Sequence, residues 1–600
     1  MLPTSTRKMA ALLISTVATL AITFFSCQKE LTGDGITMDP PNLTTTISSA
    51  VSGFVTDENG LAVNGAVVSF GNSNTLTDKY GFFEISNVPV VKEAAMVAVT
   101  MPGYFKGIKT FLATEGKSAF FRIKLVPKTI AGNVDAVLGG NVTLTNGLTI
   151  SLPANAIVNA LTNTVYAGQV KVAAHWIDPT APELNLEMPG DLRGTDTAGA
   201  LKILTTYGMA AVELTGAGGE LLQIAPGKKA TLTIPLPASL SASAPATISL
   251  WYFDESNGLW KEQGIAVKTG NNYVGEVSHF SFWNCDVPSN YVRFSCTITN
   301  AKGIPVQNAL VKVSVVNNPQ NAGFGYSDSS GYTGGAVPAN ASLLLEVFSE
   351  YNCLTGLYAK NFTTTNSNVS LGKIVIPVAN SATITGNVND CANTPVTNGY
   401  VLMNKNGLNY FKPLSKTGTF NFTTTLCAGS SNATFIAEDK TALKASDPIA
   451  VSLNSGPNDL GTLIACKIST QQFINYTING VNYSLTSPVD SIAHYSKPQN
   501  TPPTVIINGF SLSNNNTFGS ASIYFIQSGI GLNSSQNLLS FTWPQVIDSL
   551  RILTPINIKI TEYGMIGQFI AGNFSGIING APPGNIPYNV SCSFRVRRSN

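Results

Sequence analysis

The sequence predicts an all-β protein built of tandem small β-sandwiches around a larger central β-domain. The chain of 600 residues is too long for one hydrophobic core, so several domains are expected. Gly, Asn, Ser, Thr and Val are abundant whereas Glu and Lys are scarce, a mixture that favours strands and turns over helices. Apolar residues also alternate between short Gly and Asn turns, which is the pattern of half-buried strands.

Residues 1–26 are typical of an export signal. Arg7 and Lys8 form a short basic region, and the run from Met9 to Phe25 is almost wholly apolar. This run is shorter than the roughly 20 residues that span a bilayer. We therefore expect a cleaved signal rather than a retained membrane helix.

Cys27 directly follows this run in the stretch TFFSCQKE, after the small residue Ser26. The arrangement resembles a bacterial lipoprotein signal, which implies that Cys27 carries lipid such as palmitate and anchors the chain in the cell outer membrane. The stretch 28–30 resembles the surface-export tags of Bacteroidetes lipoproteins, which implies a surface-exposed protein. A plain secretory signal with an incidental cysteine is the alternative. Residues 27–48, rich in Thr, Gly, Asp and Pro, are expected to form a flexible tether.

The other cysteines are candidates for disulfides, because an exported chain can carry them. Of the eight cysteines, seven remain once Cys27 is set aside, so at least one is free or pairs outside the chain. No two stand at a CxxC spacing, which argues against a zinc site or a thioredoxin-like redox site. The expected bridges join residues of one predicted domain: Cys296 with Cys353, and two of Cys391, Cys427 and Cys466.

One pattern of alternating strands and short turns recurs three times. The copies open with VSGFVTDENGLAVNGAVVSF, RFSCTITNAKGIPVQNALVKVSV and ATITGNVNDCANTPVTNGYVLM, and they continue with TDKYGFFEI, SDSSGYTGG and SKTGTFNFT. Such strands cannot bury their apolar face alone, so each copy is expected to close as a small β-sandwich. The predicted domains are 49–127, 288–377 and 378–466.

These copies resemble the carboxypeptidase regulatory-like domain, a prealbumin-like sandwich with relatives that bind carbohydrate. The shared features are the opening G-x-V-x-D-x-x-G-x-x-(V/P)-x-x-A-x-V and the hairpin T-D-x-x-G-x-F. The third copy departs from the pattern, with Cys391 and no turn glycine at the expected place. The resemblance implies a structural or interaction module.

A longer β-unit is predicted over 128–287, and a terminal β-domain over 467–600. The longer unit opens with GGNVTLTNGLTISLPANAI, where apolar residues alternate on both sides of a turn at Gly147. This opening resembles the ZU-type β-domain of netrin receptors, ankyrins and tight-junction proteins. Asn155 stands where that family has Gly, and Asn is the residue that best replaces Gly at positive φ. The block is also similar to one in Bacteroidetes surface lipoproteins and, more distantly, in the cartilage intermediate layer protein.

The sequence favours a protein that is not an enzyme. It contains neither H-E-x-x-H nor G-x-S-x-G, and the sequence Gly116-Lys117-Ser118 lacks the earlier glycine of a phosphate loop. The three histidines are too dispersed for a metal site, and no cofactor is expected. Charged residues make up 11% of the chain with a net charge of +2, so no basic stripe for nucleic acid is expected.

One short motif, VSHFSFW, could carry chemistry through His279, Phe280 and Ser281. In some ZU-type domains, and in unrelated self-cleaving proteins, His-Phe-Ser is a site of autoproteolysis. The Ser281 hydroxyl would attack the Phe280 carbonyl in an N-to-O acyl shift, with His279 as general base or polarising the amide, and water would hydrolyse the ester. The alternative is a plain strand whose aromatic side chains fill the sandwich.

A second candidate surface is aromatic. Trp251, Tyr252 and Trp260 flank a predicted turn at Asn257-Gly258 in the stretch LWYFDESNGLW. Exposed rings of this kind can stack on sugars, and core packing is the alternative.

The expected function is that of a non-catalytic, lipid-anchored cell-surface scaffold or binding protein, with polysaccharide or a surface protein as its ligand. One alternative is a self-processing protein that cleaves itself between Phe280 and Ser281. The other is an accessory lipoprotein of a glycan-uptake system.

Overall fold

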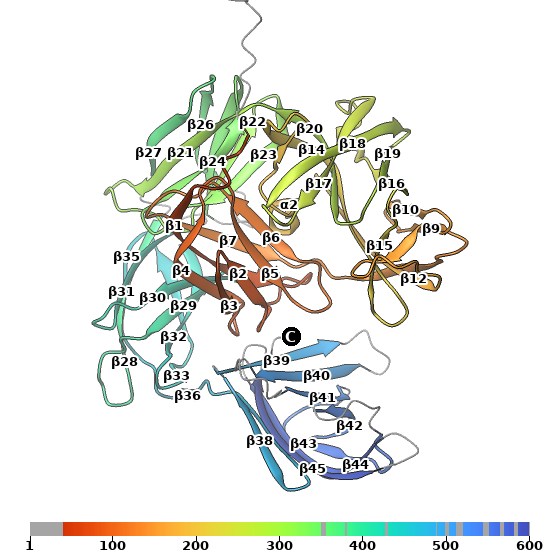
Figure 1. Cartoon of the computed structure of the whole chain (residues 1–600). Helices are drawn as coiled ribbons and strands as arrows, with labels where there is room; N and C mark the ends of the chain where they lie inside the picture. Colours follow the sequence, from red (N-terminus) through yellow and green to blue (C-terminus); the bar gives the residue numbers. More distant parts are fainter. Residues whose placement is uncertain are drawn as a thin grey trace, which may run out of the picture. The chain divides into compact units, whose positions relative to one another are not determined.

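The structure is a computed structural model that describes residues 40–349, 356–377, 381–426, 430–487, 489–497, 503–511, 520–527, 529–543, 551–564, 569–580 and 586–598. Strands dominate these ranges, and the only helical pieces within them are α2 (Leu184–Glu187) and a 3-10 turn (Ala238–Leu240). The predicted all-β fold is therefore confirmed (Figure 1). No helix in these ranges is long and apolar enough to cross a bilayer. The predicted signal and Cys27 lie outside the described residues.

The first sandwich comprises β1–β7. One of its sheets has the order β4-β1-β7 and the other the order β3-β2-β5-β6. β1 pairs antiparallel with β4 and parallel with β7. The bounds are β1 (Thr46–Thr56), β2 (Val67–Phe70), β3 (Ser73–Leu76), β4 (Phe82–Val91), β5 (Ala95–Thr100), β6 (Gly107–Phe111) and β7 (Ser118–Lys124).

Alternation along β1 separates two buried faces. Val51 and Val55 point into the core between the two sheets, whereas Phe54 points to the opposite side and is also buried. Gly53 lies between Val51 and Val55 along β1. Glycine is needed there because a Cβ would sit 2.2 Å from the carbonyl oxygen of Phe121 on β7. The glycine of the predicted opening motif is thus required by the close approach of a neighbouring strand.

The same strand order recurs in the second sandwich (β21–β27) and the third sandwich (β28–β36), so the predicted tandem repeat is confirmed. Their first sheets have the orders β24-β21-β27 and β31-β28-β35, and the central strand pairs antiparallel with one neighbour and parallel with the other. Their second sheets have the orders β23-β22-β25-β26 and β30-β29-β32-β33-β36, with β34 beside β32. The extents of the independently folding domains stay a prediction.

The strands of the second sandwich are β21 (Tyr291–Asn300), β22 (Leu310–Val315), β23 (Asn318–Tyr326), β24 (Tyr332–Pro338), β25 (Ser342–Phe348), β26 (Gly356–Thr363) and β27 (Val369–Ile376). Those of the third are β28 (Ser381–Asn389), β29 (Gly399–Lys405), β30 (Leu408–Pro413), β31 (Thr419–Thr425), β32 (Ser430–Asp439), β33 (Lys444–Ala445), β34 (Ile449–Asn454), β35 (Gly456–Ile464) and β36 (Ile468–Ser469).

Equivalent hairpin turns explain the repeated D-x-x-G spacing. The Asp78 carboxylate accepts the N–H groups of the residues two and four positions later, and Asp328 does the same in the second sandwich. Gly81 and Gly331 follow with φ values of 72° and 76°. At each glycine a Cβ would lie 2.2 Å from a carbonyl oxygen of the first strand, so no other residue fits this corner.

The central unit (β8–β20) holds thirteen strands in one sheet system, with the main order β11-β15-β14-β20-β17-β18-β19-β16-β10-β9. Asn155 in its opening has a φ of 53°, in the left-handed region that the sequence predicts for it. The strands are β8 (Ile130–Asp135), β9 (Gly140–Thr143), β10 (Thr149–Leu152), β11 (Ile157–Asn159), β12 (Gln169–Ile177), β13 (Arg193–Thr195), β14 (Leu201–Thr215), β15 (Leu221–Ile224), β16 (Ala230–Pro235), β17 (Thr247–Asp254), β18 (Leu259–Thr269), β19 (Asn272–Val277) and β20 (Phe282–Ser289).

The terminal sheet (β37–β45) has nine strands in the order β38-β37-β45-β44-β43-β42-β41-β40-β39. Its strands are β37 (Phe473–Ile478), β38 (Val481–Thr486), β39 (Asp490–Lys497), β40 (Thr504–Ser511), β41 (Ser520–Ile526), β42 (Ser535–Thr542), β43 (Asn557–Tyr563), β44 (Phe569–Asn579) and β45 (Pro587–Arg597). Their inward residues form one apolar core.

Two further cores lie between modules rather than within them. The tryptophan core joins the first sandwich to the central unit, and its members include Phe105, Ile108, Val126, Trp251, Phe253 and Trp260. The phenylalanine core joins the first sandwich to the third, and it consists of Phe54, Phe82, Phe120, Tyr400, Leu402 and Phe411. Within the phenylalanine core the rings of Phe82 and Phe411 stack with their centroids 3.6 Å apart.

Candidate functional site

The His-Phe-Ser motif lies in the connection between β19 and β20. Residues 278–281 form a bend, so the motif is not one continuous strand, but its aromatic side chains fill the interior as the structural alternative predicts. Within this bend Phe280 lies in the core of the central unit and is only 7% exposed. The following residues, Phe282 and Trp283, are buried as well.

Hydrogen bonds fix the peptide groups on both sides of the candidate cleavage point. Gln223 on β15 accepts the N–H of Phe280 through Oε1 at 2.7 Å and donates from Nε2 to the Phe280 carbonyl oxygen at 3.1 Å. The Trp283 indole donates to the His279 carbonyl at 2.9 Å, and the N–H of Val212 donates to the Ser281 carbonyl at 3.2 Å. Sequence reasoning missed Gln223, because its partner is 57 residues away and no local pattern marks the pair.

The Phe280 carbonyl, which would be attacked in self-cleavage, therefore already accepts a hydrogen bond from the Gln223 side-chain amide. In an acyl shift the negative charge would develop on this oxygen, and a fixed N–H donor stabilises such a charge. The Ser281 hydroxyl donates to the Phe282 carbonyl at 3.2 Å, so it must rotate away from this acceptor before it can attack.

His279 is half-buried against aromatic rings. Its imidazole packs edge-on against Tyr252 at 4.7 Å and lies 5.1 Å from the Trp283 ring, between centroids. Burial lowers the pKa of His279 below its usual value of 6.5, and a hydrogen bond with the backbone of Phe280 partly opposes this. The neutral imidazole, which can accept a proton, therefore predominates at neutral pH.

The predicted sugar-stacking surface is not a surface. Trp251 and Trp260 are fully buried in the tryptophan core, so the sugar-stacking interpretation is wrong for them and the alternative of core packing is confirmed. Both rings are buried because the first sandwich covers the apolar face of β17 and β18. Tyr252, on the other side of β17, is half-buried beside His279.

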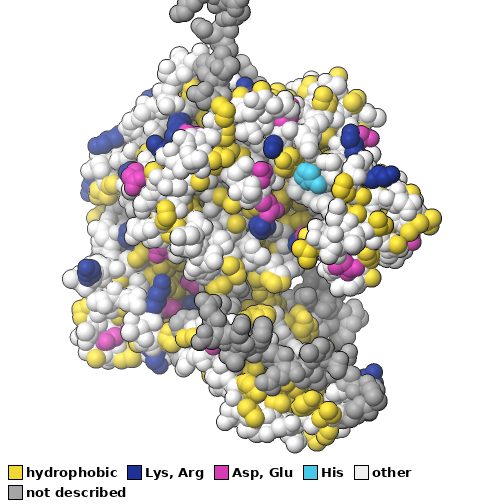
Figure 2. Space-filling view, viewed as in Figure 1, with side chains coloured by type: hydrophobic (Ala, Val, Ile, Leu, Met, Phe, Trp, Pro, Cys, Tyr) yellow, Lys and Arg dark blue, Asp and Glu magenta, His cyan; other side chains and the backbone are white. Residues whose placement is uncertain are grey.

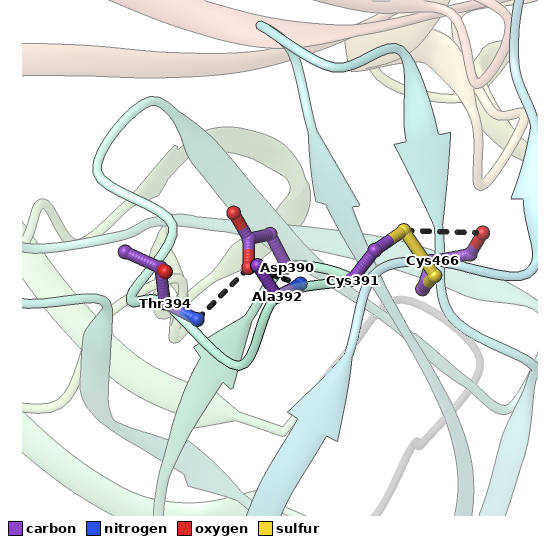
Figure 3. Close-up of a disulfide and its surroundings, with 5 residues drawn as sticks. All are labelled: Asp390, Cys391, Ala392, Thr394 and Cys466. Atoms are coloured by element: carbon purple, nitrogen blue, oxygen red, sulfur yellow. Dashed lines mark hydrogen bonds between the residues drawn. A yellow bond between two sulfur atoms is a disulfide. The ribbon is translucent and has the colours of Figure 1, made fainter.

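A disulfide joins Cys391 to Cys466 (Figure 3). Cys391 follows the end of β28 and Cys466 follows the end of β35, two strands that pair in parallel. Beside the bond, the Asp390 carboxylate accepts the N–H groups of Ala392 and Thr394, both at 2.8 Å, and this fixes the turn that carries Cys391. Cys427 lies outside the described residues.

The expected bridge between Cys296 and Cys353 is not formed by Cys296, which is a free thiol. Its side chain points from β21 into the core of the second sandwich and is 2% exposed. Burial raises the pKa of this thiol to about 12, so it stays protonated and unreactive. Cys353 lies outside the described residues, and Cys285 and Cys592 are buried free thiols.

Charge on the visible face is dispersed. Figure 2 shows Lys and Arg side chains scattered among uncharged ones, with Asp and Glu interspersed. Within the described ranges no group of three His, Cys, Asp or Glu residues is placed to hold a metal ion.

The chain is similar in sequence to cartilage intermediate layer protein 2. It is 28% identical to the mouse protein over 204 residues, which cover 32% of this chain and 17% of that protein. It is 29% identical to the human protein over 205 residues, which cover 29% of this chain and 17% of that protein. The matching region thus spans only 17% of the length of these curated relatives. No protein-family model matches the chain.

Solved structures with similar parts include a shaft pilin and a Bacillus anthracis protein. The shaft pilin SpaA of Lactobacillus rhamnosus GG overlays 30% of this chain and 97% of its own, with 9% identity and a TM-score of 0.18. The Bacillus anthracis TIE protein overlays 54% of this chain and 65% of its own, with 10% identity and a TM-score of 0.14.

Proposed function

We propose that the protein is a non-catalytic, lipid-anchored scaffold or binding protein of the cell surface. The observation that carries this proposal is the pair of inter-module cores. Contacts between domains of one chain are usually polar and permit relative motion, unless the interface is large and apolar. Here the first sandwich buries aromatic side chains against two neighbours, in the tryptophan core and the phenylalanine core.

An ion pair strengthens the junction between the first and third sandwiches. Lys79 follows Asp78 in the hairpin of the first sandwich and pairs with Glu438 on β32 of the third, and both side chains are nearly buried. Removing one partner of such a pair leaves an unpaired buried charge, which costs about 3–5 kcal/mol. The Lys79–Glu438 ion pair and the phenylalanine core both form where the first sandwich contacts the third. Together they favour one fixed arrangement of these modules, as a scaffold requires.

Two further observations support a role outside the cell. The Cys391–Cys466 disulfide suits an oxidising compartment. The mammalian relatives are named for a layer of cartilage, which is in keeping with a structural role.

Lipid anchoring and surface exposure can be tested together in a bacterial host with two membranes. The wild-type chain should incorporate labelled palmitate and be digested when protease is added to intact cells. Cys27→Ala should abolish the label, and Cys592→Ala, which alters a buried thiol far along the chain, serves as the matched control. Label retained in Cys27→Ala, or a chain protected from external protease, would contradict the proposal.

The second candidate function is a single self-cleavage between Phe280 and Ser281, favoured by the Gln223 amide that donates to the Phe280 carbonyl. The Ser281 Oγ would form a bond to the Phe280 carbonyl carbon while the C–N bond breaks. The hydroxyl proton would pass through the His279 imidazole to the departing amine. Water would then hydrolyse the ester and leave a carboxylate on Phe280.

A denaturing gel of the purified chain tests this step. Wild type should give two fragments, Ser281→Ala should give one full-length band, and Gln223→Leu should slow cleavage by about 10²–10³-fold, the usual effect of losing one oxyanion donor. A single full-length band for wild type excludes self-cleavage.

A further inference from the structure

A cavity of about 230 Å³ lies between the first sandwich, the α2 segment of the central unit and the second sandwich. Its residues come from four strands above all, β6, β7, β23 and β24. Each of these strands is the last strand of its sheet. An edge strand presents a row of backbone N–H and C=O groups without a partner in the sheet, and such a row can pair with an added strand.

The walls from the first and second sandwiches differ in their glycine content. The wall from the first sandwich is aromatic and includes Phe111, Phe120 and Phe121. The wall from the second sandwich also holds aromatic rings, among them Phe324 and Tyr332, but its strands β23 and β24 carry small residues as well: Ala322, Gly323, Gly325, Gly334, Gly335 and Ala336. A Cβ added at Gly323 or Gly335 would meet no atom within 4 Å, so neither glycine is required by its own packing.

Glycine within a strand weakens it unless something approaches its backbone closely. Since the glycine backbones on β23 and β24 border the open cavity, a second backbone can approach them there. The aromatic wall opposite supplies apolar surface for the side chains of that second chain. These features fit an extended peptide better than a sugar ring, because the hydroxyls of a sugar do not repeat with the spacing of a strand backbone.

The charge of the cavity favours acidic peptides. Lys117 and Arg122 line it, and each donates to a neutral acceptor, Lys117 to the Ser330 hydroxyl at 2.9 Å and Arg122 to the Asn409 carbonyl at 2.8 Å. The acidic side chain in the lining, Asp191, is already paired with Arg193 at 2.7 Å. The cavity is therefore positively charged and favours an acidic occupant.

We propose that this cavity binds a short extended peptide with alternating apolar and acidic side chains, as an added strand against the glycine-containing edges β23 and β24. The inference rests on the proposed binding role and names the class of partner. The peptide would belong to another protein.

Two pairs of variants of the full mature chain test it. Gly335→Val projects a side chain into the cavity without a native clash, and Gly356→Val, on the opposite edge strand β26, is its control, with its nearest atom at 3.9 Å. Lys117→Glu reverses a lining charge, and Lys360→Glu on β26 is its control. Unchanged circular dichroism and thermal unfolding establish that each variant folds.

The probe is a phage-displayed library of short random peptides, selected on wild type after depletion against Gly335→Val. Enriched peptides should alternate apolar residues with Asp or Glu, and by fluorescence anisotropy they should bind Gly335→Val and Lys117→Glu about tenfold more weakly or worse. The two controls should bind like wild type. No enrichment, equal binding to wild type and Gly335→Val, or binding of a uronic-acid oligosaccharide in place of peptide overturns the inference. Because this assay uses purified protein, its failure is distinguishable from a failure of the palmitate and surface tests.

Discussion

Loss of the Cys391–Cys466 disulfide should destabilise the third sandwich by about 2–4.5 kcal/mol. The bond closes a loop with a sequence separation of 75. In the loop-entropy account, cross-linking such a loop removes about 15 cal/mol/K from the unfolded chain, or about 4.5 kcal/mol at 25 °C, and measured values are commonly 2–4 kcal/mol. The bonded residues flank the paired ends of β28 and β35, where Asn389 lies opposite Ile464, so the folded sandwich keeps its geometry without the bond. The effect therefore falls on the unfolded chain.

Hydrogen exchange followed by mass spectrometry of the full chain is the suitable assay, because it reports each sandwich separately. In the double variant Cys391→Ser/Cys466→Ser, the slowest amides of β28 and β31 should exchange about 30-fold to about 2,000-fold faster, the ratios that correspond to 2 and 4.5 kcal/mol. Peptides from β21 and β24 in the second sandwich serve as the internal reference and should be unchanged. Equal exchange in β28 and β31 of both proteins would refute the loop-entropy reasoning.

Three further predictions concern packing and pH. Phe411→Ala removes the ring stacked on Phe82 and should cost about 3–5 kcal/mol, measured by guanidinium unfolding of the full chain; a cost below about 1 kcal/mol would show that the phenylalanine core does not hold the modules together. Gly53→Ala should yield misfolded or strongly destabilised protein, because its Cβ would lie 2.2 Å from the Phe121 carbonyl oxygen, and a wild-type melting temperature would contradict this. Acid should weaken the terminal sheet, since burial lowers the pKa of His494 from 6.5 to about 3. The unfolded chain then takes up a proton first as the pH falls from 6.5 towards 3, so stability drops in this window. In His494→Gln the stability should fall less steeply with pH in this window than in wild type. Equal pH dependence in the two proteins would exclude protonation of His494 as the cause.

The local structure of the repeats could be predicted from sequence because its causes are local. The carboxylate of Asp78 binds N–H groups two and four residues later, and Gly81 supplies the positive φ that follows. Both requirements lie within five residues of one another, so the pattern T-D-x-x-G identifies the hairpin without knowledge of the rest of the fold.

The candidate sites were harder to predict because their causes are distant in sequence. Burial of Trp251 and Trp260 depends on the first sandwich, which covers that side of the central unit. One signal was available: four successive apolar residues in LWYF indicate a strand covered on both faces rather than one exposed face. For the bond between Gln223 and Phe280 no such signal exists, since any of many polar side chains can satisfy a buried peptide group.

Comparison of the three repeats shows where the inter-module packing is encoded. Phe54 precedes Val55, whose N–H donates to the carbonyl of the hairpin glycine Gly81. Ile298 and Val388 donate in the same way to Gly331 and Gly418 in the other sandwiches. The residues equivalent to Phe54 are therefore Thr297 and Asn387. Only in the first sandwich is this outward position aromatic, and Phe54 is 2% exposed, whereas Thr297 and Asn387 are half-buried. An isolated first sandwich would expose an apolar patch that water disfavours. The first copy therefore differs from the other two at the position that meets a neighbour, and the third sandwich joins the same core through Tyr400, Leu402 and Phe411 on its second sheet.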